Sequence, residues 1–142
     1  MKQVILLKGL PGSGKSTWAK TEQSKHPNTY KRISLDDLRE MLDGGYGSKD
    51  TEKFVLRIRD SLILASLADG KHVIVDATHL HPRHEENIRR LVKGLAAVTV
   101  RDFTDVTPEE CIKRDLLRPK SVGSKVIMRM YNQFLRIQET IP

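Results

Sequence analysis

The chain has little of what stabilises secreted or membrane proteins. Its 142 residues include one cysteine, Cys111, so an internal disulfide is excluded and no second thiol stands at metal-ligand spacing. The longest apolar runs are four or five residues, and the first strand begins directly after Met1-Lys2-Gln3, so neither a membrane span nor a cleavable leader is predicted. We expect one domain, residues 1–142, in the reducing cytoplasm, with Cys111 as a packing residue.

Acidic residues are in deficit. The chain has 25 Lys and Arg against 18 Asp and Glu, a formal net charge of +7. This surplus suits a partner that carries several phosphates better than a small neutral metabolite, although lysines on solvated helix faces account for part of it.

What the chain does contain is a complete phosphate-binding loop. Residues 9–16 read Gly-Leu-Pro-Gly-Ser-Gly-Lys-Ser and follow the apolar run Val4–Leu7. The glycines allow backbone N–H groups to curl around a phosphate, Lys15 brings a mobile cation to the outer phosphates, and Ser16 supplies a hydroxyl for Mg²⁺. The helix that starts here adds its positive dipole end. A glycine-rich turn without function is the alternative, but the strand before it, the helix after it and the lysine argue against that. The predicted nucleotide-binding residues in this segment are Gly12, Ser13, Gly14, Lys15, Ser16 and Thr17.

Strand and helix patterns alternate along the chain, which indicates an α/β fold with a parallel sheet covered by helices on both faces. The expected strands are Val4–Leu7, Tyr30–Ile33, His72–Val75 and Ala97–Phe103. The expected helices are Lys15–Lys25, Asp36–Leu42, Thr51–Ala68, Pro82–Val92, Pro108–Leu117 and Lys125–Gln138. In the long third helix, an apolar stripe at helical spacing is expected to face the sheet. Its members are Phe54, Ile58, Leu62 and Ala65.

Two aspartates and an arginine follow the second expected strand, in the segment Ser34–Arg39. The carboxyl ends of parallel strands meet at the ligand crevice, so Asp36 or Asp37 could reach the hydroxyl that attacks a terminal phosphate. Arg39, three residues after Asp36, lies on the same helical face. The alternative is that both aspartates only neutralise the helix dipole while Arg39 is solvated. With a phosphate site one strand away, we favour a functional role for one aspartate.

The third expected strand ends in an acid, Asp76, as magnesium-organising strands of loop-type phosphotransferases do. Thr78 and His79 follow where an acceptor would lie. Capping of the helix near Pro82 by Thr78 or His81 is an equally good interpretation.

A basic helix that is interrupted by Pro119 carries Arg114 and Arg118 four residues apart. Such an interruption suits a lid, whose planar guanidinium groups could stabilise charge on a transferring phosphoryl group. The other interpretation is a solvated basic face opposite Ile112 and Leu116, which are expected to be buried.

Four blocks together resemble the kinase half of phage-type polynucleotide kinase. They are the loop continued through Thr17-Trp18-Ala19, then Asp36-Asp37-Leu38-Arg39, then Thr78-His79-Leu80-His81-Pro82, then Lys113-Arg114 with Arg118. The loop is shared by many nucleotide enzymes, whereas the aspartate-to-arginine block and the arginine lid are specific to this branch. The resemblance covers nearly the whole chain and implies a P-loop kinase-type sheet with a C-terminal helical lid.

The resemblance also implies transfer of the γ-phosphate of ATP, with Mg²⁺, to a 5′-hydroxyl end of DNA or RNA. Lys15 and Ser16 would bind the donor phosphates and the metal, and Asp36 would be the general base. Arg39 would bind the first internucleotide phosphate of the acceptor. Arg118, helped by Arg114, would touch the transferring phosphate. Apart from the resemblance, the positions of Thr78 and His79 after the third strand, and of Arg83 in a basic funnel, lead us to expect them at the acceptor, with Asp76 orienting a metal-bound water.

The chain departs from the phage prototype in two respects. No Asp-x-Asp-Gly-Thr-type acid pair is present, so healing of a 3′-phosphate is not expected. The third block reads Asp76-Ala77-Thr78-His79, where the family can carry a shifted acid and an asparagine, and this leaves the roles of Asp76 and His79 open. The resemblance does not fix the oligomeric state.

Two other functions remain. A small-molecule kinase of the gluconate or antibiotic phosphotransferase kind would use the same loop and a similarly placed aspartate, but it would not need a basic funnel made from Arg39, Arg83, Arg89 or Arg90. A nucleotide-dependent switch in a nucleic-acid-binding module would leave Asp36 without a role.

Overall fold

The sheet has four parallel strands in the order β2-β3-β1-β4. It is seen in a computed structural model that describes residues 1–136, so the end of the expected last helix at Gln138 lies outside the described residues. The strands are β1 (Lys2–Lys8), β2 (Tyr30–Ser34), β3 (His72–Asp76) and β4 (Ala96–Asp102). The helices are α1 (Lys15–Lys25), α2 (Leu35–Asp43), α3 (Lys49–Ala68), α4 (Pro82–Leu91), α5 (Pro108–Asp115) and α6 (Ser124–Phe134). The predicted α/β architecture is therefore confirmed, and the element boundaries agree within two residues wherever the expected boundary lies in the described part of the chain.

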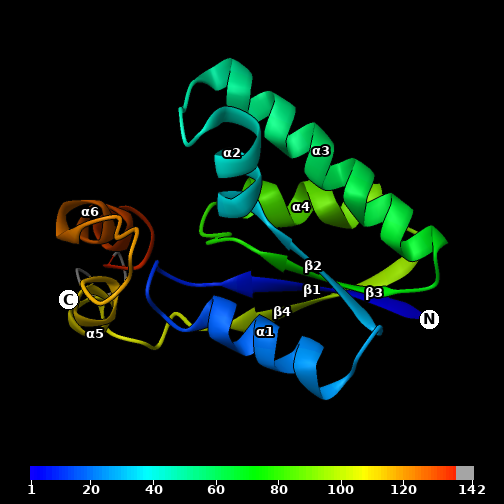
Figure 1. Ribbon diagram of the computed structural model, residues 1–142, viewed down its shortest axis with the longest axis horizontal. Helices are drawn as coiled ribbons and strands as arrows, with labels where there is room; N and C mark the ends of the chain where they lie inside the picture. Colours follow the sequence, from blue (N-terminus) through cyan, green and yellow to red (C-terminus); the bar gives the residue numbers. More distant parts are fainter. Residues whose placement is uncertain (137–142) are drawn as a thin grey trace.

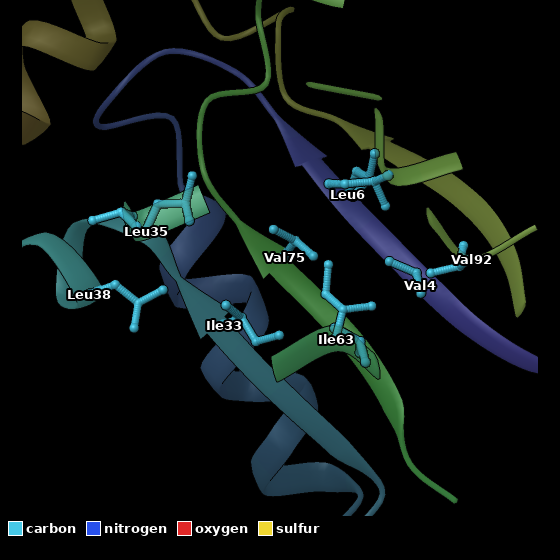
Figure 2. Packing of buried hydrophobic residues seen from close by; sticks show 11 residues of the cluster. Val4, Leu6, Ile33, Leu35, Leu38, Ile63, Val75 and Val92 are labelled. Carbon is cyan, nitrogen blue, oxygen red and sulfur yellow. The ribbon is translucent and has the colours of Figure 1, made fainter. Parts of the chain in front are cut away.

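Helices cover both faces of the sheet, as the alternation of buried side chains along β1 requires. Val4 and Leu6 point to the face covered by α2, α3 and α4, while Leu7 points to the face covered by α1, where it packs with Ala19. Figure 1 shows α1 on one side of the strands and the other three helices on the opposite side. Figure 2 shows how side chains of β1, β2 and β3 meet those of the covering helices in the larger core.

Three of the four residues of the stripe expected on α3 are wrong: Phe54, Leu62 and Ala65 are exposed, whereas Ile58 packs against the larger core as predicted. The buried residues of the helix are Val55, Arg59, Ile63 and Ser66. Apolar residues occur around most of this helix, so spacing alone did not choose the face. The true inner stripe includes an arginine and a serine, which a search for apolar periodicity passes over.

α5 and α6 lie beyond the carboxyl ends of the strands, away from the main layers (Figure 1). They share a separate small core in which Cys111 and Ile127 pack against Leu10 of the phosphate loop. Burial of Cys111 agrees with its predicted packing role, whereas Leu116 is exposed, contrary to expectation, because α5 ends at Asp115. Among the described residues, no helix is both long and apolar enough to cross a membrane.

Candidate phosphotransfer site

A cleft of about 1000 Å³ opens at the carboxyl ends of the strands, between the phosphate loop, α2 and the segment formed by α5, α6 and their connection (residues 108–134). We call this segment the lid. Most of the predicted site residues line it: Gly12, Gly14, Lys15, Ser16, Thr17, Asp36, Arg39, Asp76, Thr78, His79, Arg114 and Arg118. The cleft therefore brings together residues from segments that lie far apart in the sequence.

The phosphate loop holds the side chain of Lys15 in a buried position. Its Nζ donates to the carbonyl oxygens of Gly9 (2.9 Å) and Leu10 (2.7 Å) and lies 3.3 Å from the Ser13 hydroxyl. Burial lowers the pKa of Lys15 from 10.5 to about 8, against the opposing effect of Asp76. Ser13, which belongs to the same loop, is buried. Its hydroxyl contacts Lys15, and it does not line the cleft.

Gly12 and Gly14 have φ of 84° and 100°, the left-handed region that glycine adopts without strain. A Cβ atom on Gly12 would also collide with the backbone carbonyl oxygen of Cys111 in α5. Glycine at position 12 is thus required both by the turn and by the close approach of the lid.

Ser16 and Asp76 converge where a magnesium ion was predicted. The Ser16 hydroxyl donates to Oδ2 of Asp76 (2.8 Å), and Asp76 is buried. Arg32 approaches the same oxygen with Nε (3.0 Å) and Nη2 (2.8 Å) and so balances the buried charge. The sequence analysis missed Arg32. β2 carries two adjacent charges, Lys31 and Arg32, and the sequence alone gives no signal that Arg32 is the one that reaches Asp76 of β3.

Asp36 and Arg39 form one end of a three-residue chain of ion pairs. Nη1 of Arg39 lies 2.8 Å from Oδ1 of Asp36, which is exposed to the cleft. The opposite side of the same guanidinium makes two bonds to Glu52 of α3, from Nε (3.0 Å) and Nη2 (2.8 Å). This pairing raises the pKa of Arg39 and lowers that of Glu52. Glu52 was also missed, because 13 residues and a turn separate it from Arg39.

Two residues after β3 form hydrogen bonds to the end of β1 and the start of the phosphate loop. The carbonyl oxygen of Thr78 accepts from the backbone N–H of Gly9 (3.0 Å), and the His79 ring bonds through Nδ1 to the carbonyl oxygen of Leu7. His79 has a φ of 47° and is buried, and burial lowers its pKa to about 4. His79 is therefore a neutral, anchored ring, and Nδ1 must carry the proton in its bond to a carbonyl.

Of the two capping candidates, His81 caps α4 by accepting from the backbone N–H of Arg83 (3.1 Å). Arg83 itself is exposed and does not line the cleft. Arg89, another member of the expected funnel, bonds to Glu85 (2.9 Å) and to the Val98 carbonyl of β4 (3.3 Å). The structure thus brings Arg39 to the cleft but not the cations of α4.

The lid presents Arg114 and Arg118 to the cleft from α5 and the turn after it. Arg114 pairs with Glu110 (3.1 Å), and Arg118 lies 3.5 Å from the fully buried Asp115. Asp115 also accepts from the backbone N–H groups of Val122 and Gly123, so it shapes the connection between α5 and α6. Both arginines are about half exposed and could turn toward a bound phosphate.

One ion pair joins the lid to the opposite wall of the cleft. Nζ of Lys120 lies 3.0 Å from Oε1 of Glu40 in α2. Because both side chains are exposed, this pair is worth little by itself, but it shows how near the lid approaches α2.

Comparisons with known proteins place the chain among P-loop kinases. A family model described as an AAA domain (AAA_33) matches residues 4–137. An adenylate kinase of Campylobacter curvus (strain 525.92) is 25% identical over 151 residues, which cover 96% of this chain and 78% of that protein.

Among solved structures, a chain of the Pnkp1/Rnl/Hen1 RNA repair complex is 26% identical with a TM-score of 0.81. The match covers 99% of this chain but only 46% of that one, so the present chain spans less than half of its length. A gluconokinase from Sinorhizobium meliloti 1021 matches with a TM-score of 0.64 over 97% of this chain and 78% of that one. At 18% identity, the gluconokinase likeness shows the shared fold alone.

Proposed function

The chain belongs to the AAA domain family and is a P-loop phosphotransferase that binds ATP, and from this premise we propose that its acceptor is the 5′-hydroxyl end of DNA or RNA. The observation that carries the proposal is the arrangement of Asp36, Arg39 and Glu52 across one cleft from Lys15 and Ser16. It supplies a carboxylate for a hydroxyl on one wall and a phosphate cradle on the other.

The donor side is formed by the phosphate loop with Thr17, Arg114 and Arg118. On ATP binding, Nζ of Lys15 would move from the carbonyl oxygens of Gly9 and Leu10 to the β- and γ-phosphates. Their negative charge would raise its pKa again, so that Lys15 is fully protonated. Ser16 and Asp76 fit Mg²⁺, because a hydroxyl and one carboxylate beside substrate phosphates are the oxygen ligands this ion accepts. When bound, the ion neutralises charge on the phosphates.

On the acceptor side, Asp36 would take the proton of the 5′-hydroxyl as its oxygen attacks the γ-phosphorus. The bond from that phosphorus to the bridging oxygen breaks, and ADP leaves. Arg39, held by Glu52 and paired with Asp36, would orient Asp36 and bind the first internucleotide phosphate of the acceptor, and Thr78 and His79, which line the same cleft, would face the acceptor. Arg118 would stabilise charge on the transferring group. Arg83 would act only at the outer rim.

The architecture supports a single kinase domain over residues 1–142, because the three hydrophobic clusters surround one sheet and its attached lid. A small-molecule kinase is the second candidate. It is favoured by the pairing of Arg39 and Arg89 with acids, which leaves the acceptor wall less positive than a funnel for a polyanion would be.

The experiment that tests the proposal measures transfer of labelled γ-phosphate from ATP and Mg²⁺. The acceptors are 5′-hydroxyl DNA, 5′-hydroxyl RNA, gluconate and a panel of small hydroxyl metabolites. We expect label on the oligonucleotides, and 5′-phosphorylated oligonucleotides serve as the blocked control. Label on a metabolite alone would retain the phosphotransferase and overturn the acceptor class.

A further inference from the structure

A second hollow, which we call the α1 groove, lies along the outer side of α1 and has a volume of about 460 Å³. In the described part of the chain, no other helix packs on this side of α1 (Figure 1). The residues that line the groove recur at helical spacing and are all exposed: Thr17, Lys20, Thr21, Ser24 and Lys25. Thr17 and Lys20 also line the cleft, so the α1 groove adjoins the cleft directly.

The α1 groove is positively charged. It is lined by two lysines and three hydroxyl side chains, and by no carboxylate. The one acidic residue of α1, Glu22, lies outside the groove, 3.8 Å from His26. Neither Lys20 nor Lys25 has an acidic partner within residues 1–136. Both lysines are therefore available to an anionic ligand.

The other cations of the cleft are less available. Four arginines line it, and each lies against a carboxylate: Arg32, Arg39, Arg114 and Arg118. Lys15 is buried in the phosphate loop. Lys20 is therefore the cation of the cleft that is both exposed and without an acidic partner among the described residues. Since the cations of α4 do not line the cleft, unpaired positive charge continues from the cleft along α1 and not along α4.

A third cation without an acidic partner in the described part of the chain lies beside α1. The exposed guanidinium of Arg101 in β4 lies 4.6 Å from the ring centroid of Trp18, and Trp18 lines the cleft. Together with Lys20 and Lys25, Arg101 makes the surroundings of this helix positive, which attracts a polyanion.

We propose that the α1 groove binds the phosphates of the acceptor strand that follow its first internucleotide phosphate. Lys20 and Lys25 pair with these phosphates, and the hydroxyls of Thr17 and Ser24 donate to their oxygens. This deepens the proposed function and rests on it. The helix rises about 12 Å from Thr17 to Lys25, which is long enough for more than one nucleotide of a strand. Because contacts to phosphate carry no information about the base, the groove accepts any sequence.

The test compares a 5′-hydroxyl dinucleotide, whose single internucleotide phosphate would be bound by Arg39, with a 5′-hydroxyl 12-mer that extends beyond it. Values of kcat and KM are measured for the wild type, Lys25→Gln and the double variant Lys20→Gln/Lys25→Gln. The matched control is Lys53→Gln/Lys93→Gln, which removes the same charge from exposed lysines that line neither the cleft nor the α1 groove.

We expect the wild type to have a lower KM for the 12-mer than for the dinucleotide. Each lysine removed from the α1 groove should raise KM for the 12-mer about two- to fivefold, as for an exposed ion pair, and leave KM for the dinucleotide and for ATP unchanged. The slope of log KM for the 12-mer against log salt concentration should fall by about 0.7 for each lysine. The control variant should behave as the wild type does.

Each outcome decides the proposal. Equal KM values of the wild type for the two acceptors, or an equal effect of the groove and control variants, would overturn it and leave the kinase intact. A rise in KM for ATP alone would assign the groove to the donor and overturn it as well. Phosphorylation of neither acceptor by the wild type would remove the proposed function together with this groove. Thermal unfolding of each variant shows that the substitutions, all at exposed positions, leave the fold unchanged.

Discussion

Burial lowers the pKa of Lys15, the residue whose positive charge the proposed function needs for binding the ATP phosphates. Its pKa of about 8 in the free protein means that part of its charge is lost just above neutral pH. Bound phosphates favour the charged form, so ATP binding above pH 8 must be accompanied by proton uptake.

We predict that ATP affinity falls as pH rises above 8. The dissociation constant at pH 9 should be about tenfold larger than at pH 7, since each pH unit beyond the pKa of the free protein costs a factor of ten. Calorimetric titration with ATP at several pH values measures this. In Lys15→Met the weak residual binding should show no such dependence, and an equal dependence in both proteins would contradict the assignment.

Glu52 pairs with Arg39 and so fixes the guanidinium that contacts Asp36, although Glu52 itself does not line the cleft. Glu52→Gln preserves shape but removes the charge that fixes Arg39, so we predict a fall in kcat of about tenfold with KM for ATP unchanged. The matched control is Glu85→Gln, whose partner Arg89 lies outside the cleft. Steady-state kinetics of both variants give the result, and an equal effect of the two would show that Glu52 has no positioning role.

The sequence could predict the residues whose chemistry is local. Lys15, Ser16 and the Asp36–Arg39 pair stand in short motifs at strand ends, and the structure brings them to one cleft. Arg32 and Glu52 could not be found in this way, because their partners come from other elements and their roles depend on how β2 and α3 pack.

At the scale of the elements, the phosphate loop and α5 are in direct contact. A side chain on Gly12 would meet the Cys111 carbonyl oxygen, whereas one on Gly94, which has nearly the same φ (81° against 84°), would meet no atom within 4 Å. Alanine substitutions at Gly94 and Gly12 therefore distinguish the free-energy cost of backbone strain alone from that of strain together with the contact to α5.

We predict that Gly94→Ala lowers the free energy of unfolding by about 1 kcal/mol, the usual cost of the left-handed region. Gly12→Ala should cost about 1–3 kcal/mol more and should weaken ATP binding, because the loop or α5 must move. Urea denaturation and nucleotide titration check both effects. Equal stability of the two variants would mean that the loop and the lid are not tightly packed.

Element types were easier to predict from the sequence than the faces that the elements bury. Three of the four residues predicted to face the sheet on α3 were wrong, because the helix carries apolar residues on several sides and buries Arg59, which pairs with Asp60, and no apolar pattern reveals such a pair. Leu116 was misplaced because the last turn of α5 ends at Asp115, whose side chain bonds to Val122 and Gly123 across the turn.

For the whole molecule, the net charge of +7 bears on the nature of the acceptor. If about two phosphates of a single strand are neutralised on binding, KM for the acceptor should rise roughly sevenfold between 50 and 200 mM salt. Kinetics with a 5′-hydroxyl oligonucleotide at saturating ATP measure this, with a single nucleoside as the control that lacks internucleotide phosphates. A KM that does not change with salt would favour the small-molecule alternative.

The central claim is that one cleft holds ATP phosphates on the loop and a 5′-hydroxyl on Asp36. The most direct measurement is the rate of γ-phosphate transfer from ATP to a 5′-hydroxyl oligonucleotide by wild type, Asp36→Ala and Asp37→Ala, with ATP binding measured in each. We predict that Asp36→Ala loses about 10²- to 10⁴-fold in rate, the contribution of a general base, and binds ATP as the wild type does. Asp37→Ala, which removes only the 3.3 Å contact to Arg32, should lose less than about tenfold. Wild-type turnover in Asp36→Ala would contradict the account.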